Sequence, residues 1–301
     1  MGLPSVGVIG AGRMGNPMAR NLLAAGYAVH VHDLRPEACT GLVSRGAVLC
    51  GSPAEVAAAA EIILLSLVHV SAIREVLFGP SGVASVPVAG KVVIDTSTSS
   101  PTETRLMAQR LAALGAGMLD APVTGGVAGA EAGTLNIMAG GDPETYERCL
   151  PILQVLGGTV VRVGGSGAGQ VAKLANQMMM CGYFAIIAEA FAFVEEMGVD
   201  PAKVFQVVET GGARSGLLTG FGRQYVRRAE TGEDDPPDEH YTFLYKKDLH
   251  LALEEGHATD CHLPVTAAAH ELFKQVLGSG IKASFPLNLL ELWHLLRGRR
   301  K

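Results

Sequence analysis

The chain has 301 residues, 48% of them hydrophobic and 18% charged, so it is long enough for about two domains and too apolar for a disordered, collagen-like or coiled-coil protein. Its net charge of -5 at pH 7 argues against a nucleic-acid partner, which normally requires a basic face. Glycine is unusually frequent, with 38 residues, and without a three-residue period this predicts many tight turns and close backbone approaches.

The first half of the chain alternates short apolar runs with helical segments. Strands are predicted at residues 6–9, 28–32, 62–67, 92–95, 118–119, 135–139 and 160–163. Their nearly continuous apolar character is typical of parallel strands that are covered on both faces. Ser52-Pro53, Ser100-Pro101 and Asp142-Pro143 predict helix starts, because each pairs a capping side chain with proline at the first helical position. Strands that alternate with helices predict a doubly wound α/β sheet.

The second half of the chain contains only helical patterns. Residues 170–197 form one long predicted helix that is apolar nearly all round, with Gly198 suited to its C-terminus and Asp200-Pro201 to the start of the next helix. The acidic run at residues 230–240 is expected to be a surface loop. We therefore predict a Rossmann-type domain over residues 1–166 and an all-helical domain over residues 167–301, joined by the long helix.

The cysteines and the apolar segments indicate in which cellular compartment the protein is found. The five cysteines are scattered without a CxxC pair, which is typical of free thiols in a reducing compartment. No signal-peptide pattern is present, and residues 178–194 contain Glu189 and are interpreted as a buried helix rather than a membrane span. We expect a cytoplasmic protein with no membrane partner; an organellar matrix protein without its transit peptide would look the same.

A glycine-rich turn follows the first predicted strand. Gly10, Gly12 and Gly15 form a G-x-G-x-x-G pattern that leads into a predicted helix. The first glycine permits the tight turn, the second lets a pyrophosphate approach the backbone, and the third allows close packing of helix on strand. Asp33 ends the second predicted strand, where an acidic residue bonds the adenosine ribose. This context favours a dinucleotide site over a turn that is merely rich in glycine.

Asp33 and Arg35 favour different cofactors. The Asp33 carboxylate would accept hydrogen bonds from the ribose hydroxyls and repel the 2′-phosphate of NADP, whereas Arg35 could pair with that phosphate. The sequence favours NAD and leaves NADP as the alternative.

A second glycine cluster runs from Asp120 to Leu135. In it, the Thr124 hydroxyl precedes two flexible backbone amides, those of Gly125 and Gly126, a combination suited to a small anion such as a carboxylate. The alternative interpretation is an ordinary loop between two strands.

Two polar residues lie at the start of the long helix. Lys173 and Asn176 are three positions apart and share one helix face. On an apolar helix such a pair needs a buried partner or a ligand, and a lysine there could act as general acid or base. The alternative is a lysine whose ammonium simply reaches solvent.

Taken together, these motifs resemble the β-hydroxyacid dehydrogenase family, which includes 3-hydroxyisobutyrate dehydrogenase and tartronate semialdehyde reductase. The resemblance extends over essentially the whole chain. It depends on the residues 10–15, 95–98, 120–135, 167–176 and 247–249, which occur in the family's order. It implies a dinucleotide-binding domain followed by an all-helical domain.

The resemblance also implies roles for individual residues. Lys173 is implied as the proton donor or acceptor, with Asn176 as a catalytic and substrate-binding neighbour. The other substrate-binding residues are expected to be Thr124, Gly125 and Gly126. The expected cofactor-binding residues are Gly10, Ala11, Gly12, Arg13, Met14, Gly15, Asp33, Leu34, Arg35, Leu67, Val68, Ser97, Thr98, Lys247 and Asp248.

Three departures from the family pattern concern the substrate. Leu67-Val68-His69 stands where the family often has Leu-Pro-Asn, His240 stands where an aromatic residue is common, and Ala283-Ser284-Phe285 replaces the usual Asp-x-Ser. Gly133-Thr134-Leu135 is more similar to the tartronate semialdehyde reductases, whereas Leu67-Val68 is more similar to the L-threonate dehydrogenases. These similarities point to different substrates.

We therefore expect an NAD(P)-dependent oxidoreductase that interconverts a small β-hydroxycarboxylate, of the 3-hydroxyisobutyrate or glycerate/tartronate semialdehyde type, and its aldehyde or ketone. Alternatives are an L-threonate-type dehydrogenase, a non-catalytic dinucleotide-binding protein and, less favoured, a reductase of imines. No metal is expected, since the histidines show no ligand spacing. The apolar long helix predicts a homodimer or homotetramer.

Overall fold

The computed structural model describes residues 2–298, which form two compact units that divide between Lys173 and Leu174. Each unit is described by itself. The sequence-based boundary between residues 166 and 167 stays a prediction.

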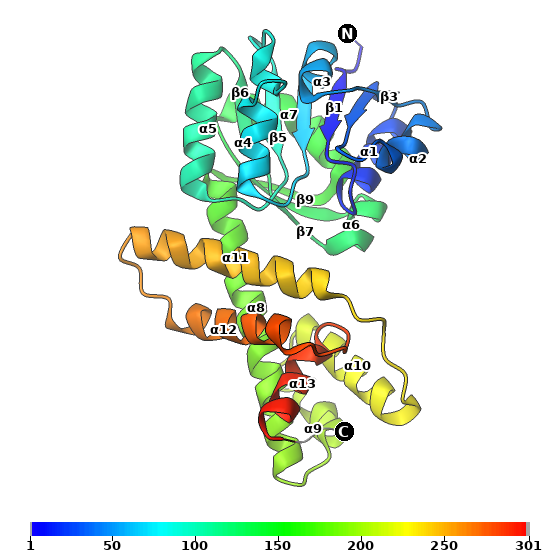
Figure 1. Ribbon diagram of the computed structural model, residues 1–301, viewed down its shortest axis with the longest axis vertical. Helices are drawn as coiled ribbons and strands as arrows, with labels where there is room; N and C mark the ends of the chain where they lie inside the picture. The colour runs from blue at the N-terminus through cyan, green and yellow to red at the C-terminus, as the bar shows by residue number, and fades with distance from the viewer. Residues whose placement is uncertain (1, 299–301) are drawn as a thin grey trace. The chain divides into compact units, whose positions relative to one another are not determined.

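The N-terminal unit is built around one sheet (Figure 1). Its strands are β1 (Val6–Ile9), β2 (Val29–His32), β3 (Val48–Leu49), β4 (Ile62–Leu65), β5 (Val92–Asp95), β6 (Gly117–Asp120), β7 (Val123–Thr124), β8 (Leu135–Gly140) and β9 (Gly157–Gly164). Its α-helices are α1 (Gly15–Ala24), α2 (Thr40–Val43), α3 (Pro53–Ala59), α4 (Val70–Phe78), α5 (Pro101–Ala113), α6 (Gly126–Ala132) and α7 (Pro143–Leu156). Every strand predicted from the sequence is present, and the two-residue strands β3 and β7 are additional.

The sheet has the order β3-β2-β1-β4-β5-β6-β8-β7, with β9 paired to β8. The strands from β3 to β6 pair in parallel, as predicted for a doubly wound fold. Strand β8 runs antiparallel to β6 and β7, so the sheet is mixed. The connection from β6 to β8 contains the short strand β7 and helix α6.

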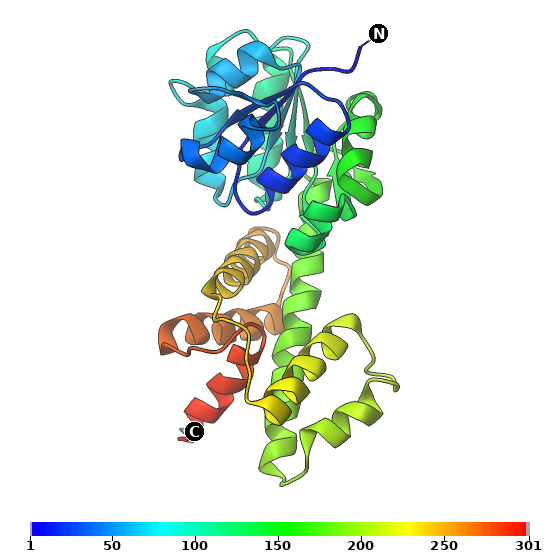
Figure 2. The same ribbon diagram turned by 90° about the vertical axis from the view of Figure 1, so that its right-hand side faces the viewer.

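Helices cover both faces of the sheet, so alternate strand residues enter separate cores. Ile62 and Leu64 of β4 pack with residues of α1, α6 and α7, whereas Ile63 and Leu65 pack with residues of α3, α4 and α5. Figure 2 shows α1 and α7 on one side of the sheet and α4 and α5 on the other. All four β4 residues are fully buried, which explains why the strand is apolar throughout.

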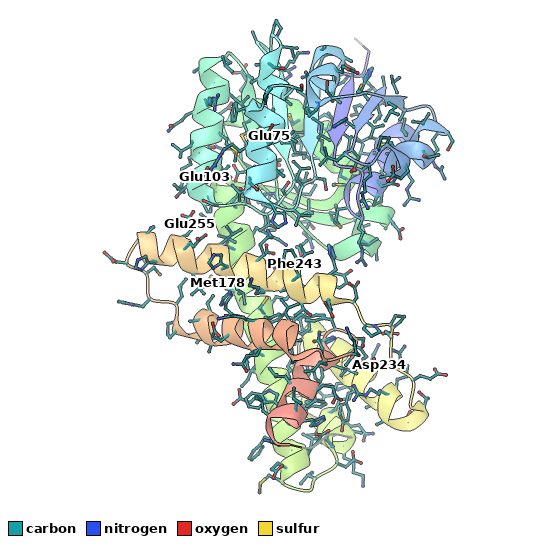
Figure 3. All side chains as sticks on the ribbon, viewed as in Figure 1. Glu75, Glu103, Met178, Asp234, Phe243 and Glu255 are labelled. Carbon is teal, nitrogen blue, oxygen red and sulfur yellow. The ribbon has the colours of Figure 1, made fainter. Side chains whose placement is uncertain are left out.

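The predicted helix caps are present in this unit. The hydroxyls of Ser52 and Ser100 accept from the backbone N–H three residues later, and the Asp142 carboxylate does the same for Thr145. A hydrogen bond from the Thr145 side chain is the main reason that the pKa of Asp142 lies below its ordinary value. Glu103 in the first turn of α5 pairs with Arg74 of α4 at 2.6 Å, and Figure 3 labels it.

The C-terminal unit is entirely helical in the part of the chain that the structure describes, as predicted. Its helices are the greater part of α8 (Ala168–Glu196), followed by α9 (Pro201–Val208), α10 (Gly216–Thr231), α11 (Glu239–Ala258), α12 (Pro264–Ser279) and α13 (Leu287–Leu296). Gly198 ends the α8 region with φ +70°, and the Asp200 side chain caps α9. The fully buried side chains of this unit include Cys181, Phe273 and Leu287.

Helix α8 combines buried and exposed apolar surface. Its length and hydropathy would suffice to cross a membrane, but 44% of its most apolar window is buried in the protein, and Phe184, Ala188 and Phe191 belong to the helical core. The exposed residues form a line along the helix, which we term the α8 apolar stripe. Its members are Met179, Tyr183, Ile186, Phe193 and Met197, each 48–64% exposed.

A cluster of charged and polar side chains lies in the helical unit near the end of α8. Glu195 accepts from the Tyr225 hydroxyl at 2.8 Å and lies 2.5 Å from Nε2 of His294. Nδ1 of His294 lies 3.2 Å from Glu291, which also pairs with Arg228. We term Glu195, Tyr225, Arg228, Glu291 and His294 the charge cluster. Both ring nitrogens of a buried histidine thus face carboxylates.

The five cysteines are free, as predicted, and four of them are buried. Burial raises the pKa of the Cys149 thiol to about 12. Cys261 is exposed. The buried thiols therefore behave as small apolar core residues.

Candidate functional site

The carboxyl ends of the parallel strands meet at one edge of the N-terminal sheet. The register aligns Ile9 of β1 with Leu65 of β4, Leu65 with Asp95 of β5, and Asp95 with Asp120 of β6. The strand order also reverses between β1 and β4, which is where open α/β sheets bind their ligands. The residues that follow these strands therefore form the candidate site.

The glycine turn after β1 has the geometry that the sequence predicted. Gly10 has φ +94°, and a Cβ there would lie 2.3 Å from the carbonyl oxygen of Ser66. A Cβ at Gly15 would lie 1.8 Å from the Gly10 carbonyl oxygen, so only glycine permits α1 to begin this close to the strand. A Cβ at Gly12 would meet nothing within 4 Å, which leaves the space that an approaching ligand requires.

The start of α1 can attract an anion. Its N-terminus has no capping side chain, and the first amides of a helix carry partial positive charge. Met14 is half-buried at this N-terminus and Arg13 is exposed. Together with the open space at Gly12, these groups fit the pyrophosphate of a dinucleotide.

Asp33 follows β2 and contacts the same turn. Its Oδ2 accepts from the backbone N–H of Ala11 at 2.8 Å, and its Oδ1 accepts from the N–H of Arg35 at 2.9 Å. The Arg35 guanidinium lies 3.9 Å from Oδ1 and is largely exposed. Leu34 is 93% exposed. Because both of its oxygens accept backbone bonds, the Asp33 carboxylate has a fixed position beside the glycine turn.

The loops after β4 and β5 are bonded to each other. The Ser97 hydroxyl accepts from the backbone N–H of Leu67 at 2.9 Å, and the Thr96 hydroxyl donates to the carbonyl of Leu65 at 2.6 Å. Ser97 is buried and Thr98 half-buried, whereas Val68 is 40% exposed. Two of the predicted cofactor-binding segments therefore form one connected structure.

The second glycine cluster is more ordered than the loop that the sequence also allowed. Thr124 ends β7, Gly125 has φ +126°, and Gly126 begins α6 with φ +64°. Both glycines are exposed, and Gly133 ends α6 in the left-handed conformation. The positive φ values explain the glycines, since other residues rarely adopt them.

Asp120 connects the end of β6 to the first turn of α8. Its Oδ1 accepts from the N–H of Gly167 at 2.8 Å, and its Oδ2 accepts from the N–H of Gln170 at 3.0 Å. Asp120 therefore caps α8 although it lies far from it in sequence. Burial raises the pKa of this carboxyl, while its backbone hydrogen bonds act in the opposite direction. A Cβ at Gly169 would lie 2.3 Å from the Met138 carbonyl oxygen, so glycine permits the close approach.

Gln170 joins this first turn to the loop after β5. Its Oε1 accepts from the backbone N–H of Ser99 at 2.9 Å, and its Nε2 donates to the backbone carbonyl of Ser97 at 2.9 Å. Gln170 and Ser99 are both fully buried. We term this pair of hydrogen bonds the Gln170 clamp.

Lys173 lies one turn after Gln170 and is only 7% exposed. An isolated buried ammonium is energetically costly, so this burial separates Lys173 from an ordinary surface lysine. Asn176, three residues later on α8, is half-buried. The two residues share one face of the helix.

A chain of hydrogen bonds begins at Asn176 within the helical unit. Its Nδ2 donates to Oε1 of Gln177 at 3.0 Å, and Nε2 of Gln177 donates to Asp248 at 2.6 Å. The other Asp248 oxygen lies 2.9 Å from the ammonium of Lys247. Asn176, Lys247 and Asp248 are therefore connected through a glutamine that the sequence analysis did not select.

Comparison with known proteins is consistent with this geometry. Residues 5–165 match the family described as the NAD binding domain of 6-phosphogluconate dehydrogenase. Residues 167–285 match the family described as NAD-binding of NADP-dependent 3-hydroxyisobutyrate dehydrogenase. The 2-hydroxy-3-oxopropionate reductase of Escherichia coli (strain K12) is 38% identical over 282 residues, covering 91% of this chain and 92% of that protein. The chain belongs to the β-hydroxyacid dehydrogenase family.

Other members show how wide this family is. The L-threonate dehydrogenase of Cupriavidus necator is 35% identical over 277 residues, which cover 92% of this chain and 91% of that protein. The structure of Mycobacterium tuberculosis 3-hydroxyisobutyrate dehydrogenase with L-serine superposes with a TM-score of 0.86 at 29% identity, covering 98% of this chain and 100% of that one. This β-hydroxyacid dehydrogenase is therefore an oxidoreductase of the NAD(P)-dependent class, with a Rossmann-type domain and a helical domain.

Sequence reasoning about this β-hydroxyacid dehydrogenase missed three residues. Asp120 was noted only as the start of a motif, and neither Gln170 nor Gln177 was assigned a role. A signal was present, since Gln170, Lys173 and Gln177 recur at helical spacing on an otherwise apolar helix. Such a stripe of polar residues predicts buried hydrogen-bond partners, but it does not identify the residues that serve as those partners.

Proposed function

We propose that this chain interconverts a small β-hydroxycarboxylate and the corresponding aldehyde or ketone, with Lys173 as general acid and base. The burial of Lys173, on a helix whose first turn is bonded to the loop after β5, is the observation that supports the proposal best. A positioned lysine of this kind can exchange a proton with a reacting hydroxyl.

The cofactor would be bound by residues from several strand ends. The glycine turn and the start of α1 would contact the pyrophosphate, Asp33 the adenosine ribose, and Ser97, Thr98, Leu67 and Val68 the nicotinamide side. Lys247 and Asp248 complete the proposed set. The cofactor, when bound, supplies the acceptor or donor of a hydride. NAD is favoured because the fixed negative charge of Asp33 would repel a 2′-phosphate, and NADP is the alternative.

Lys173 handles the proton in both directions of the reaction. In oxidation, the carbon that bears the hydroxyl loses a hydride with its electron pair, and the hydroxyl proton passes to the neutral amine of Lys173. The C–O single bond thereby becomes a carbonyl. In reduction, the carbonyl carbon gains the hydride, and the ammonium of Lys173 donates a proton to the oxygen.

The substrate class follows from the anion-binding groups and from the family. The Thr124 hydroxyl and the Gly125 and Gly126 amides would bind the substrate carboxylate, with Asn176 beside the reacting hydroxyl. The named relatives act on 3-hydroxyisobutyrate, 2-hydroxy-3-oxopropionate and L-threonate. We favour substrates of the first two types, and the Leu67-Val68 segment makes an L-threonate-type substrate the alternative.

A spectrophotometric screen at 340 nm with a lysine variant tests the proposal. The wild type is assayed with 3-hydroxyisobutyrate, glycerate, L-threonate and serine, each with NAD and NADP. Lys173→Ala is expected to lose about 10²–10⁴-fold in kcat, the usual contribution of general acid–base catalysis, while it binds NADH normally by fluorescence. An enzyme that retains most of its turnover without Lys173 would refute the proton-transfer role, and cofactor binding without turnover would favour a non-catalytic protein.

We further propose that the protein is a cytoplasmic homo-oligomer, a dimer or tetramer. The α8 apolar stripe supports this proposal, because exposed apolar residues in a continuous line commonly mark a surface that another subunit covers. The subunit that covers the α8 apolar stripe would be another copy of this chain.

A further inference from the structure

Gln170 is fixed from two directions at once. Its backbone N–H donates to Asp120 at the end of β6, and its side chain is held through the Gln170 clamp by the loop after β5. Gln170 therefore lies where two strand ends and the start of α8 meet. All of these groups belong to the N-terminal unit and are buried.

The clamp uses the whole amide group. A primary amide holds an accepting oxygen and a donating NH2 group in one plane. In Gln170 the oxygen accepts from the Ser99 N–H and the NH2 group donates to the Ser97 carbonyl. A side chain with only one of these functions would leave a buried backbone group without its partner, which is costly. The position thus requires a donor and an acceptor at the same time.

The clamp connects the two sides of the proposed chemistry. Residues 97 and 98 are proposed to contact the nicotinamide, and the Ser97 hydroxyl extends the connection to the backbone of Leu67. On the other side, Lys173 lies three residues after Gln170, which is about 4.5 Å along the helix axis at ~1.5 Å per residue.

We infer that Gln170 is a positioning residue, which sets the distance between the proton-carrying lysine and the loop on the nicotinamide side. This inference rests on the proposed role of Lys173. Displacement of reacting groups by about 1 Å can cost about 10²-fold in rate, so loss of the clamp should reduce kcat while binding of substrate and cofactor changes little.

Gln170→Glu and Gln170→Met are the informative variants. Glutamate has the shape of glutamine, but its ionised form places a carboxylate against the Ser97 carbonyl. Its protonated form can again donate to Ser97 and accept from Ser99, so acid should restore the clamp. Methionine has a similar length and cannot form either bond at any pH. Gln154→Glu, at an exposed position of α7, is the matched control for the added charge.

The experiment measures kcat, KM and the deuterium isotope effect with 4-deuterated NADH across pH, each relative to the wild type at the same pH. At pH 8 we expect kcat of both Gln170 variants to fall about 10²-fold, with KM and NADH affinity within threefold and a larger isotope effect. As pH falls, Gln170→Glu should recover and Gln170→Met should not. Hydrogen exchange of residues 96–99 in the cofactor-free protein should be faster in Gln170→Met.

Other results would overturn the inference. Wild-type kcat in Gln170→Met, unchanged exchange of residues 96–99, or a fall in kcat that follows the loss of folded protein would each contradict a positioning role. Lys173→Ala is assayed in parallel, and its retention of turnover would instead remove the proposed function on which the inference depends. The two failures are thereby distinguished.

Discussion

The two ends of α8 are held by different chemistry. At its N-terminal end, Asp120 and Gln170 bond to backbone groups. At its C-terminal end, Glu195 bonds to the side chains of Tyr225 and His294. Backbone partners persist under every substitution except proline, so these hydrogen bonds depend on the side chains of Asp120 and Gln170. In the charge cluster both partners of each bond are side chains, so substitution of any one of its five members removes a bond. The Arg297 guanidinium adds a bond to the backbone carbonyl of Ala192 at 3.0 Å.

The largest effect on stability is expected from His294→Leu. The change would leave Glu195 and Glu291 beside an apolar group without the ring that lies between them. Leaving a buried polar group without its hydrogen-bond partner costs about 1–3 kcal/mol, with the larger values for charged groups, so with two carboxylates affected we expect a loss of about 3 kcal/mol in the free energy of unfolding. Urea denaturation measures this loss of stability, and His262→Leu, at an exposed position, is the control. Equal stability of the two variants would contradict the view that the charge cluster stabilises the folded protein.

A smaller effect is expected from Phe193→Glu on the α8 apolar stripe. If a second copy covers the stripe, removing one phenylalanine from the interface costs about 2 kcal/mol, or about thirtyfold in the dissociation constant. Sedimentation at several concentrations measures it. Leu106→Glu changes a similarly exposed residue on α5 and should leave the mass unchanged. A monomeric wild type would disprove the proposed oligomer.

The smallest effect is expected from Asp142→Ala at the start of α7. Loss of an N-cap costs about 1 kcal/mol of the free energy of unfolding. Because the pKa of Asp142 is lowered in the folded protein, its stabilisation is complete above the ordinary pKa and is lost as pH falls through the lowered one. The difference from the wild type should therefore be present at pH 7 and shrink in acid. A difference that grows in acid would refute the assignment.

Asp120 provides the contrast to Asp142. Both carboxylates cap helices, yet burial raises the pKa of Asp120. A raised pKa means that ionisation of this group opposes folding as pH rises above its ordinary value. The contributions of these two capping aspartates to the free energy of unfolding thus depend on pH in opposite directions, because the Asp142 carboxylate is in solvent and the Asp120 carboxylate is buried.

The parts of the fold that depend on local pattern could be predicted from the sequence. Strand β4, the Ser100 cap and the Gly10 turn each follow from neighbouring residues, and the structure contains all three. The strands β3 and β7 were missed because two residues cannot establish an alternation. The reversed direction of β8 was missed because direction depends on the partner strand and leaves no mark in the residues themselves.

The bonds that organise the candidate site could not be predicted in the same way. Gln170 contacts residues 71 and 73 positions away, and Glu195 and His294 are 99 positions apart. Spacing along one helix reveals which residues share a face, but not which loop lies against that face. The roles of Lys173 and Asn176 rest on the family resemblance and stay predictions.

The glycine turn contains two kinds of glycine within six residues: those that folding requires, and one, Gly12, that folding does not require. At Gly10 and Gly15 the protein's own atoms forbid a side chain, so any replacement would be eliminated as a failure to fold. At Gly12 no atom of the chain lies within 4 Å of an added Cβ, so a methyl group would fit. A lineage that ceased to use its dinucleotide could therefore lose Gly12 while it remained folded, and this one position would record the change.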